Sequence, residues 1–199
     1  MNLFLSVWLH PKQAARFLIN QKSVLYAMVL VVLGFMASAL LGFQNTEMYP
    51  EIPYVWVVIS VIILAPILGV IMYGISVGVS FFIGKLLGGV GTFSDVVKGL
   101  SASYIPFIVA GPIYIIWLLI SPESFFLKEV TDLMAIIGTV VTLVTSIWAV
   151  VITVGALAEA HSYSNGRAII TIIIPIILLF AALIAIIFFI IAVFTAANL

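Results

Sequence analysis

The sequence predicts an all-α membrane protein with five transmembrane helices. Of its 199 residues, 65% are hydrophobic and only 7% are charged, whereas a soluble domain usually carries about 25% charged residues. The chain also contains five apolar runs, each long enough for a crossing of roughly 20 residues. These runs lack the alternation of barrel strands, and lipid cannot satisfy an open backbone, so they must be helices. The predicted spans are 23–43, 54–84, 103–121, 133–158 and 168–194.

The distribution of basic residues orients these spans. Cytoplasmic flanks of membrane spans retain Lys and Arg. One set of connecting segments holds Lys12, Arg16, Lys22, Lys85, Lys98 and Arg167, and the opposite set holds Lys128 alone. We therefore expect a cytoplasmic N-terminus, a C-terminus outside, and residence in the cytoplasmic (inner) membrane.

Composition also excludes several function classes. The formal net charge is zero, so the chain lacks the basic surface that a nucleic-acid partner requires. With no cysteine, it can form neither disulfides nor thiolate metal sites. No basic residue precedes the first apolar run and no small-residue cleavage motif follows it, so we expect no cleaved signal peptide.

Residues 1–22 form two apolar stripes separated by Pro11 and interspersed with cations. The first stripe comprises Phe4, Leu5, Trp8 and Leu9, and the second comprises Ala14, Ala15, Leu18 and Ile19. This pattern predicts an amphipathic segment that lies on the inner leaflet. Alternatively, the segment only anchors the first span through Trp8 and its basic residues.

The second span, 54–84, is longer than a perpendicular crossing needs, so it must tilt, extend beyond the bilayer or bend at Pro66. Gly74 and Gly78 have the small-xxx-small spacing that lets another helix approach closely. Packing within the chain and packing between copies or partners are both compatible with this pattern.

The segment that follows, 84–95, contains Gly88, Gly89 and Gly91, which favour a tight turn. Thr92 and Asp95 have the spacing of a capping box, so a helix is expected to start here and lead into the third span. No Gly-Lys-Ser/Thr sequence follows the glycines, so turn geometry explains them better than phosphate binding.

The prolines of the later spans suggest a second architecture. Pro66, Pro106, Pro112 and Pro175 lie within or at the ends of spans, where each removes a backbone hydrogen bond and could break a helix as in transporters. Proline is also common in membrane helices that have no transport role.

In the next outer connection, Ser121 and Pro122 predict the start of a short helix through Phe125, Phe126 and Lys128.

The fourth span carries Thr139, Thr142, Thr145, Ser146 and Thr153, which we expect to hydrogen-bond across helices. The connection 159–167 is the most polar stretch of the chain and holds Glu159 and His161. Lys85 and Glu159 lie near the cytoplasmic ends of two spans, where they could form an ion pair or extend separately to the interface. Glu159 and His161 are two residues apart, which is the wrong spacing for one helical face.

Several of these segments together resemble the Yip1-domain family in its short prokaryotic form. The matching residues are the run from Leu86 to Phe93, the Tyr104-Ile105-Pro106 triplet, Trp148, the run from Ala158 to Ser164, and Trp8 and Pro11 near the start. The resemblance covers nearly the whole chain and rests on order and spacing. It implies an integral membrane protein with five helices.

Eukaryotic members of that family act in vesicle traffic, pair with one another and contact small GTPases. This chain lacks their long N-terminal region with its Asp-Leu-Tyr-Gly-Pro-like motif, so the resemblance does not extend a GTPase partner to it. We expect the lipid bilayer, other integral membrane proteins and a second copy of the chain as partners.

No catalytic motif, metal-ligand set or cofactor fingerprint is present, so we expect a non-enzymatic protein without cofactors. The leading hypothesis is a scaffold or accessory subunit for other membrane proteins. The alternative is a small transporter or lipid-translocating protein with a cavity among proline-broken spans. The candidate functional residues are Lys85, Gly88, Gly89, Gly91, Pro106, Glu159 and His161, and the candidate helix-packing residues are Gly74 and Gly78.

Overall fold

The computed structural model describes residues 2–47, 49–51 and 53–197, and every regular element in these ranges is helical. Five of the helices are long and apolar enough to cross a membrane. The predicted all-α fold with five such helices is therefore confirmed. The elements in order are α1 (Leu3–Leu9), α2 (Pro11–Gln21), α3 (Val24–Leu41), α4 (Tyr54–Leu86), α5 (Phe93–Leu100), the 3-10 helix η1 (Ser101–Tyr104), α6 (Ile105–Ile120), α7 (Pro122–Phe126), α8 (Leu133–Ala160) and α9 (Asn165–Ala197).

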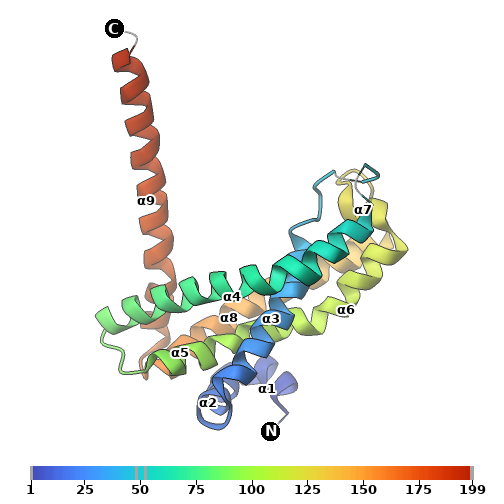
Figure 1. Ribbon diagram of the computed structural model, residues 1–199. Helices are drawn as coiled ribbons and strands as arrows, with labels where there is room; N and C mark the ends of the chain where they lie inside the picture. The colour runs from blue at the N-terminus through green and yellow to red at the C-terminus, as the bar shows by residue number, and fades with distance from the viewer. Residues whose placement is uncertain (1, 48, 52, 198–199) are drawn as a thin grey trace.

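Four of the long helices form a bundle, and the fifth departs from it. In Figure 1, α4, α6 and α8 run obliquely in similar directions and α3 crosses among them. Contacts of α3 with α4 and α6, and of α6 with α8, hold this bundle together. α9 packs against α8 and α4 near its start, and most of its length stands clear of the bundle.

The short helices mark the two ends of the bundle. α2 and α5 lie at one end, together with the C-terminal ends of α4 and α8, and α7 lies at the other end (Figure 1). The predicted capping box at the start of α5 is confirmed, because the Thr92 and Asp95 side chains each accept a hydrogen bond from the other residue's backbone N–H. α5 then continues through η1 into α6, so the third apolar region is helical from Phe93 to Ile120.

The N-terminal segment is divided between core and surface. The α2 stripe is covered by protein, since Ala14, Ala15 and Leu18 are fully buried where α2 packs against α8 and α5. The α1 stripe is different: Leu5 and Leu9 remain exposed, and Trp8 stacks on Trp148 with ring centroids 6.2 Å apart. The part of the segment that is free to enter lipid is therefore α1.

Three details of the predicted elements need correction. The helices α4, α6 and α9 continue without interruption through Pro66, Pro112 and Pro175, and Pro106 lies in the first turn of α6, where a missing N–H costs no helical bond. The prolines therefore break none of these spans.

Two hydroxyls of α8 bond within their own helix, whereas we expected bonds across helices. Thr142 and Thr153 donate to the carbonyls of Gly138 and Ala149, four residues earlier in the same helix, at 2.8 Å in both cases. A hydroxyl that bonds its own helix backbone has no donor left for a neighbour.

The short helix α7 ends at Phe126, before Lys128, and Ser121 does not cap it with its side chain. The Ser121 hydroxyl instead donates to the Asp132 carboxylate. Asp132 is itself the N-cap of α8, because it accepts from the Ala135 N–H at 2.8 Å. The α7 connection is thereby fastened to the start of α8.

Candidate functional site

His161 lies in the polar connection between the fourth and fifth spans and is surrounded by aromatic rings and glycines. It follows the last residue of α8, and its side chain is fully buried. The imidazole stacks between Tyr163 and Phe81, with ring centroids 5.2 Å and 6.3 Å away. Two aromatic neighbours and an inaccessible ring define an enclosed position rather than an open site.

The glycines of the α4–α5 connection enclose the same imidazole. A Cβ atom at Gly84 would overlap Nε2, and a Cβ atom at Gly89 would overlap Nδ1. Gly91 lies against the Ala160 carbonyl, where a Cβ would overlap the backbone oxygen. Any side chain at these three positions would exclude the histidine from its present place.

Backbone hydrogen bonds fasten this enclosure. The Val90 N–H donates to the His161 carbonyl at 3.1 Å, and the Gly89 N–H donates to the Gly84 carbonyl at 2.8 Å. Gly88 has a φ of +85°, a left-handed conformation that favours glycine. We call His161, Phe81, Tyr163, Gly84, Gly89 and Gly91 the His161 junction.

The junction also holds the start of α9. The Tyr163 hydroxyl lies 2.9 Å from the Thr171 hydroxyl, which itself donates to the Arg167 carbonyl at 2.9 Å. Burial raises the pKa of Tyr163, so this phenol remains protonated and able to donate. The junction therefore joins α4, the glycine-rich turn, α8 and α9 at one point.

His161 is electrically neutral in this environment. Its pKa lies below the usual value, first because burial penalises the imidazolium and second because Lys85 is positive; the Ser80 backbone and Asp95 act in the opposite direction. Neither ring nitrogen has a hydrogen-bond partner with acceptable geometry among the described residues. With no acid or base bonded to it, the ring is placed for packing rather than for proton transfer.

Glu159 pairs with Arg16, so the suggested ion pair with Lys85 is wrong. The Arg16 Nε and Nη2 atoms donate to the two carboxylate oxygens of Glu159 at 2.5 Å and 3.1 Å. The bidentate pair raises the pKa of Arg16. It ties α2 to the last turn of α8, although the Arg16 side chain is 63% exposed.

Of the remaining candidate residues, Lys85 and Gly88 lie near the His161 junction, whereas Pro106, Gly74 and Gly78 lie apart from it. The Lys85 ammonium lies 5.5 Å from the centroid of the Phe81 ring and is otherwise exposed, as the alternative of extension to the interface predicts. Gly88 is exposed on the outside of the turn, and Pro106 is buried in α6, away from the residues that surround His161. Gly74 and Gly78 have no neighbour within 4 Å of an added Cβ, so packing within the chain does not use them.

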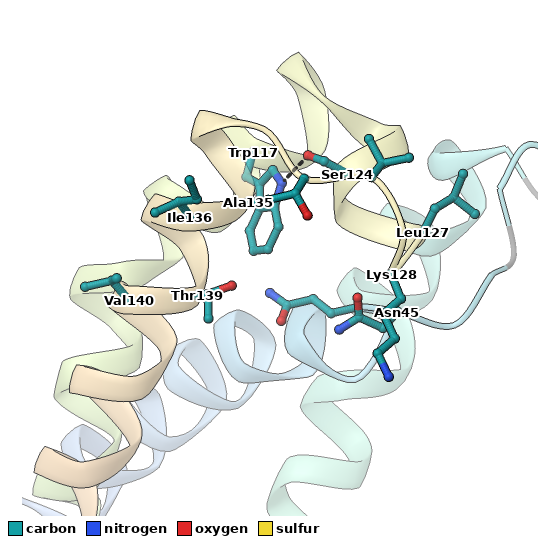
Figure 2. Close-up of a pocket in the computed structure, with 12 residues that line it drawn as sticks. Asn45, Trp117, Ser124, Leu127, Lys128, Ala135, Ile136, Thr139 and Val140 are labelled. Atoms are coloured by element: carbon teal, nitrogen blue, oxygen red, sulfur yellow. Dashed lines mark hydrogen bonds between the residues drawn. The ribbon is translucent and has the colours of Figure 1, made fainter.

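Sequence reasoning missed Arg16, Phe81 and Tyr163 as site residues. Arg16 and Glu159 are 143 positions apart, and no local pattern links them. Gly84 begins the glycine-rich segment that was predicted to turn, but its contact with the His161 ring was not predicted. Sequence reasoning also missed a half-polar pocket at the α7 end of the bundle, which Figure 2 shows.

Five apolar helices that bury few of their residues define a polytopic integral membrane protein. The model of the Yip1 domain matches residues 5–195. The chain therefore belongs to the Yip1 family, as the resemblance of its motifs indicated, and members of that family are generally non-enzymatic membrane proteins. Comparisons with curated proteins and with solved structures found no match.

Proposed function

We propose that this chain is a non-enzymatic scaffold or accessory subunit of the cytoplasmic membrane that binds other integral membrane proteins, and that it also binds a second copy of itself. The observation that carries the proposal is the uncovered surface between α4 and α9. α9 contacts α8 and α4 near its start, but none of its most apolar stretch is buried in the chain, so that stretch presents its surface to lipid or to another protein.

The shape of that surface fits a partner helix. A cavity of about 460 Å³ lies between α4 and α9, with walls formed by Gly78, Phe82 and Leu178 among other apolar residues. Gly74 is exposed one turn earlier on α4. Glycines at this spacing let two helix backbones approach closely, and in lipid such packing is a main source of helix association.

The His161 junction supports the same proposal. It fastens the start of α9 to α4 and α8 through buried, uncharged contacts, so the angle between α9 and the bundle is held at its base. A fixed open angle preorganises the surface for a partner, which lowers the entropy that association costs.

The test compares the companions of three variants in native-lipid discs by mass spectrometry. Gly74→Leu and Gly78→Leu are expected to lose a stoichiometric protein companion, or the second copy, because leucine fills the space that the partner backbone needs. Val55→Leu, which adds bulk at an exposed position near the start of the same helix and away from the two glycines, is the matched control and should retain the companion. Unchanged capture by both glycine variants would refute the assignment of this surface.

A second candidate function is transport or lipid translocation, and one cavity favours it. Between α3, α4, α6 and α8 lies a cavity of about 320 Å³ whose walls include the hydroxyls of Ser38, Tyr73, Ser76, Ser103, Tyr104 and Thr153. Ser38, Ser103 and Thr153 donate to carbonyls of nearby residues in their own chain segments. If the chain is a transporter, purified protein in liposomes should move an ion, a lipid or a hydrophobic peptide at a rate above background. The absence of flux for all three would eliminate this candidate.

A further inference from the structure

A pocket at the α7 end of the bundle has the features of a ligand site. Its volume is about 290 Å³. Figure 2 shows Trp117 and Thr139 on one side of it and Asn45 and Lys128 on the other. The walls come from the connection after α3, the end of α6, α7, the α7–α8 connection and the first turns of α8.

The walls of this pocket are held in place by side-chain contacts. The Trp117 indole N–H donates to the Ser124 hydroxyl at 2.9 Å (Figure 2). The Trp117 ring also fills the space beside Gly138, where a Cβ would overlap it. The Ser121–Asp132 hydrogen bond described above closes the connection, so the pocket is built before any ligand enters.

Side chains that can donate hydrogen bonds line the pocket without partners of their own. The Gln44 Nε2 atom is buried and has no partner among the described residues. The side chains of Lys128, Asn45 and Thr139 make no hydrogen bond or ion pair with any other described residue. A buried donor without a partner destabilises the folded chain, and a ligand rich in acceptor oxygens, such as a phosphate, would supply the missing partner.

One wall of the pocket continues onto the lipid-facing surface. Ile136 and Val140 line the pocket from α8, and they are 54% and 53% exposed. A ligand with its phosphate among the donors could therefore extend acyl chains along these residues into the bilayer. A phosphate attached to a lipid fits this combination better than a free phosphate, which would leave the apolar wall uncovered.

The charges at this end of the chain select among phospholipids. Lys128 is accompanied there by Glu47, Glu51, Glu123, Glu129 and Asp132. An excess of carboxylates disfavours a lipid with net negative charge, whereas an ammonium in the headgroup would be attracted to them. We propose that the pocket binds the headgroup of a zwitterionic phospholipid, with the phosphate at Gln44 and Lys128 and the ammonium outside the pocket, toward the carboxylates of the connections at this end of the chain.

Native mass spectrometry of the delipidated full chain tests this proposal with phosphatidylethanolamine and phosphatidylglycerol as probes. Wild type should retain the ethanolamine lipid in preference to the glycerol lipid. Lys128→Gln and Gln44→Leu should each weaken retention of the ethanolamine lipid by about tenfold, the effect of one lost hydrogen bond to a charged group. Lys85→Gln removes an exposed cation at the opposite end and should change nothing.

Thermal unfolding keeps the test decisive if a variant folds poorly. The ethanolamine lipid should raise the unfolding temperature of wild type and of Lys85→Gln, and it should raise that of Lys128→Gln much less. Equal retention by wild type and both pocket variants would overturn the site. Equal or stronger retention of phosphatidylglycerol by wild type would overturn the zwitterionic selectivity.

Discussion

His161 shows how a single polar side chain can be structural in a membrane protein. The sequence predicted a polar cytoplasmic connection, and the histidine at its centre would normally contact water there. The structure instead buries it between Phe81 and Tyr163 and encloses it with glycines. A neutral imidazole is flat and uncharged, so it can stack on aromatic neighbours and fill such a space without a charge to compensate.

The burial of His161 predicts that the protein loses stability in mild acid. Its folded pKa lies below the unfolded value, which is about 6.5. As the pH falls below about 6.5, the unfolded chain binds a proton that the folded chain does not, so the free energy of unfolding decreases. The unfolding temperature, followed by tryptophan fluorescence from pH 8 to pH 5, should therefore fall.

His161→Gln should be less stable at pH 8 but should lose less stability on acidification. The other histidine of the chain provides the control: His10→Gln should retain the wild-type pH dependence. An equally steep decrease in the His161 and His10 variants would show that another group is responsible.

The Arg16–Glu159 pair predicts a stabilisation that depends on salt. The Arg16 guanidinium donates two hydrogen bonds to the Glu159 carboxylate, yet the Arg16 side chain is mostly exposed. Dissolved ions screen exposed ion pairs and weaken them. Glu159→Gln should lower the unfolding temperature slightly at low salt, and the difference from wild type should narrow at about 1 M salt, where the screening length is roughly 3 Å. Lys85→Gln should show no such salt-dependent loss, and a similar loss there would argue against a specific pair.

At the scale of elements, the glycine-rich turn after α4 packs closely against the end of α8. These residues were predicted to form a tight turn, and their local backbone conformation agrees with that prediction. What they enclose could not be predicted, because the His161 ring arrives from a segment about 70 positions later. Local signals such as the Thr92–Asp95 capping box were predictable, since both partners lie within one helical turn.

One glycine packed against another segment and one glycine in open space should respond to alanine substitution with opposite changes in stability. At Gly91 a Cβ would overlap the Ala160 backbone oxygen, which cannot rotate away, so Gly91→Ala should destabilise the protein by about 1–3 kcal/mol. At Gly74 an added Cβ meets nothing within 4 Å, and replacing a helix-interior glycine by alanine usually stabilises by about 0.5–1 kcal/mol.

The two alanine variants are compared by unfolding in one detergent, with wild type as the reference. Gly91→Ala should unfold at a lower temperature and Gly74→Ala at the same or a higher one. A tolerated Gly91→Ala would mean that the α4–α5 turn can move away from α8, in which case the His161 junction does not fix the base of α9.

At the scale of the whole molecule, hydrophobicity determined the spans but not their arrangement. The five apolar runs were predictable because lipid forces each into a helix. Their packing was not, because nearly uniform apolar surfaces do not distinguish one neighbour from another. The departure of α9 from the bundle illustrates this: its sequence resembles those of the other spans, and only the contacts at its base give its direction.

The remaining whole-molecule prediction is the orientation in the membrane. α2 and α5 lie at one end of the bundle and α7 at the other (Figure 1), and six of the seven basic residues belong to the segments at the α2 and α5 end, where α4 and α8 also end. The first end should therefore face the cytoplasm. Because the chain has no cysteine, single introduced thiols report this directly without background labelling.

We expect an impermeant maleimide to label Glu123→Cys and Thr195→Cys on intact cells, and Gln21→Cys only after permeabilisation; all three positions are exposed. The first two report the α7 connection and the last turns of α9, and the third reports α2. The cysteine-free wild type supplies the blank. Labelling of Gln21→Cys on intact cells with protection of Glu123→Cys would invert the topology, and it would move the Lys128 pocket to the cytoplasmic leaflet. If Thr195→Cys alone is protected, α9 does not cross the membrane, and its apolar surface must be covered by lipid or by a partner on the cytoplasmic side.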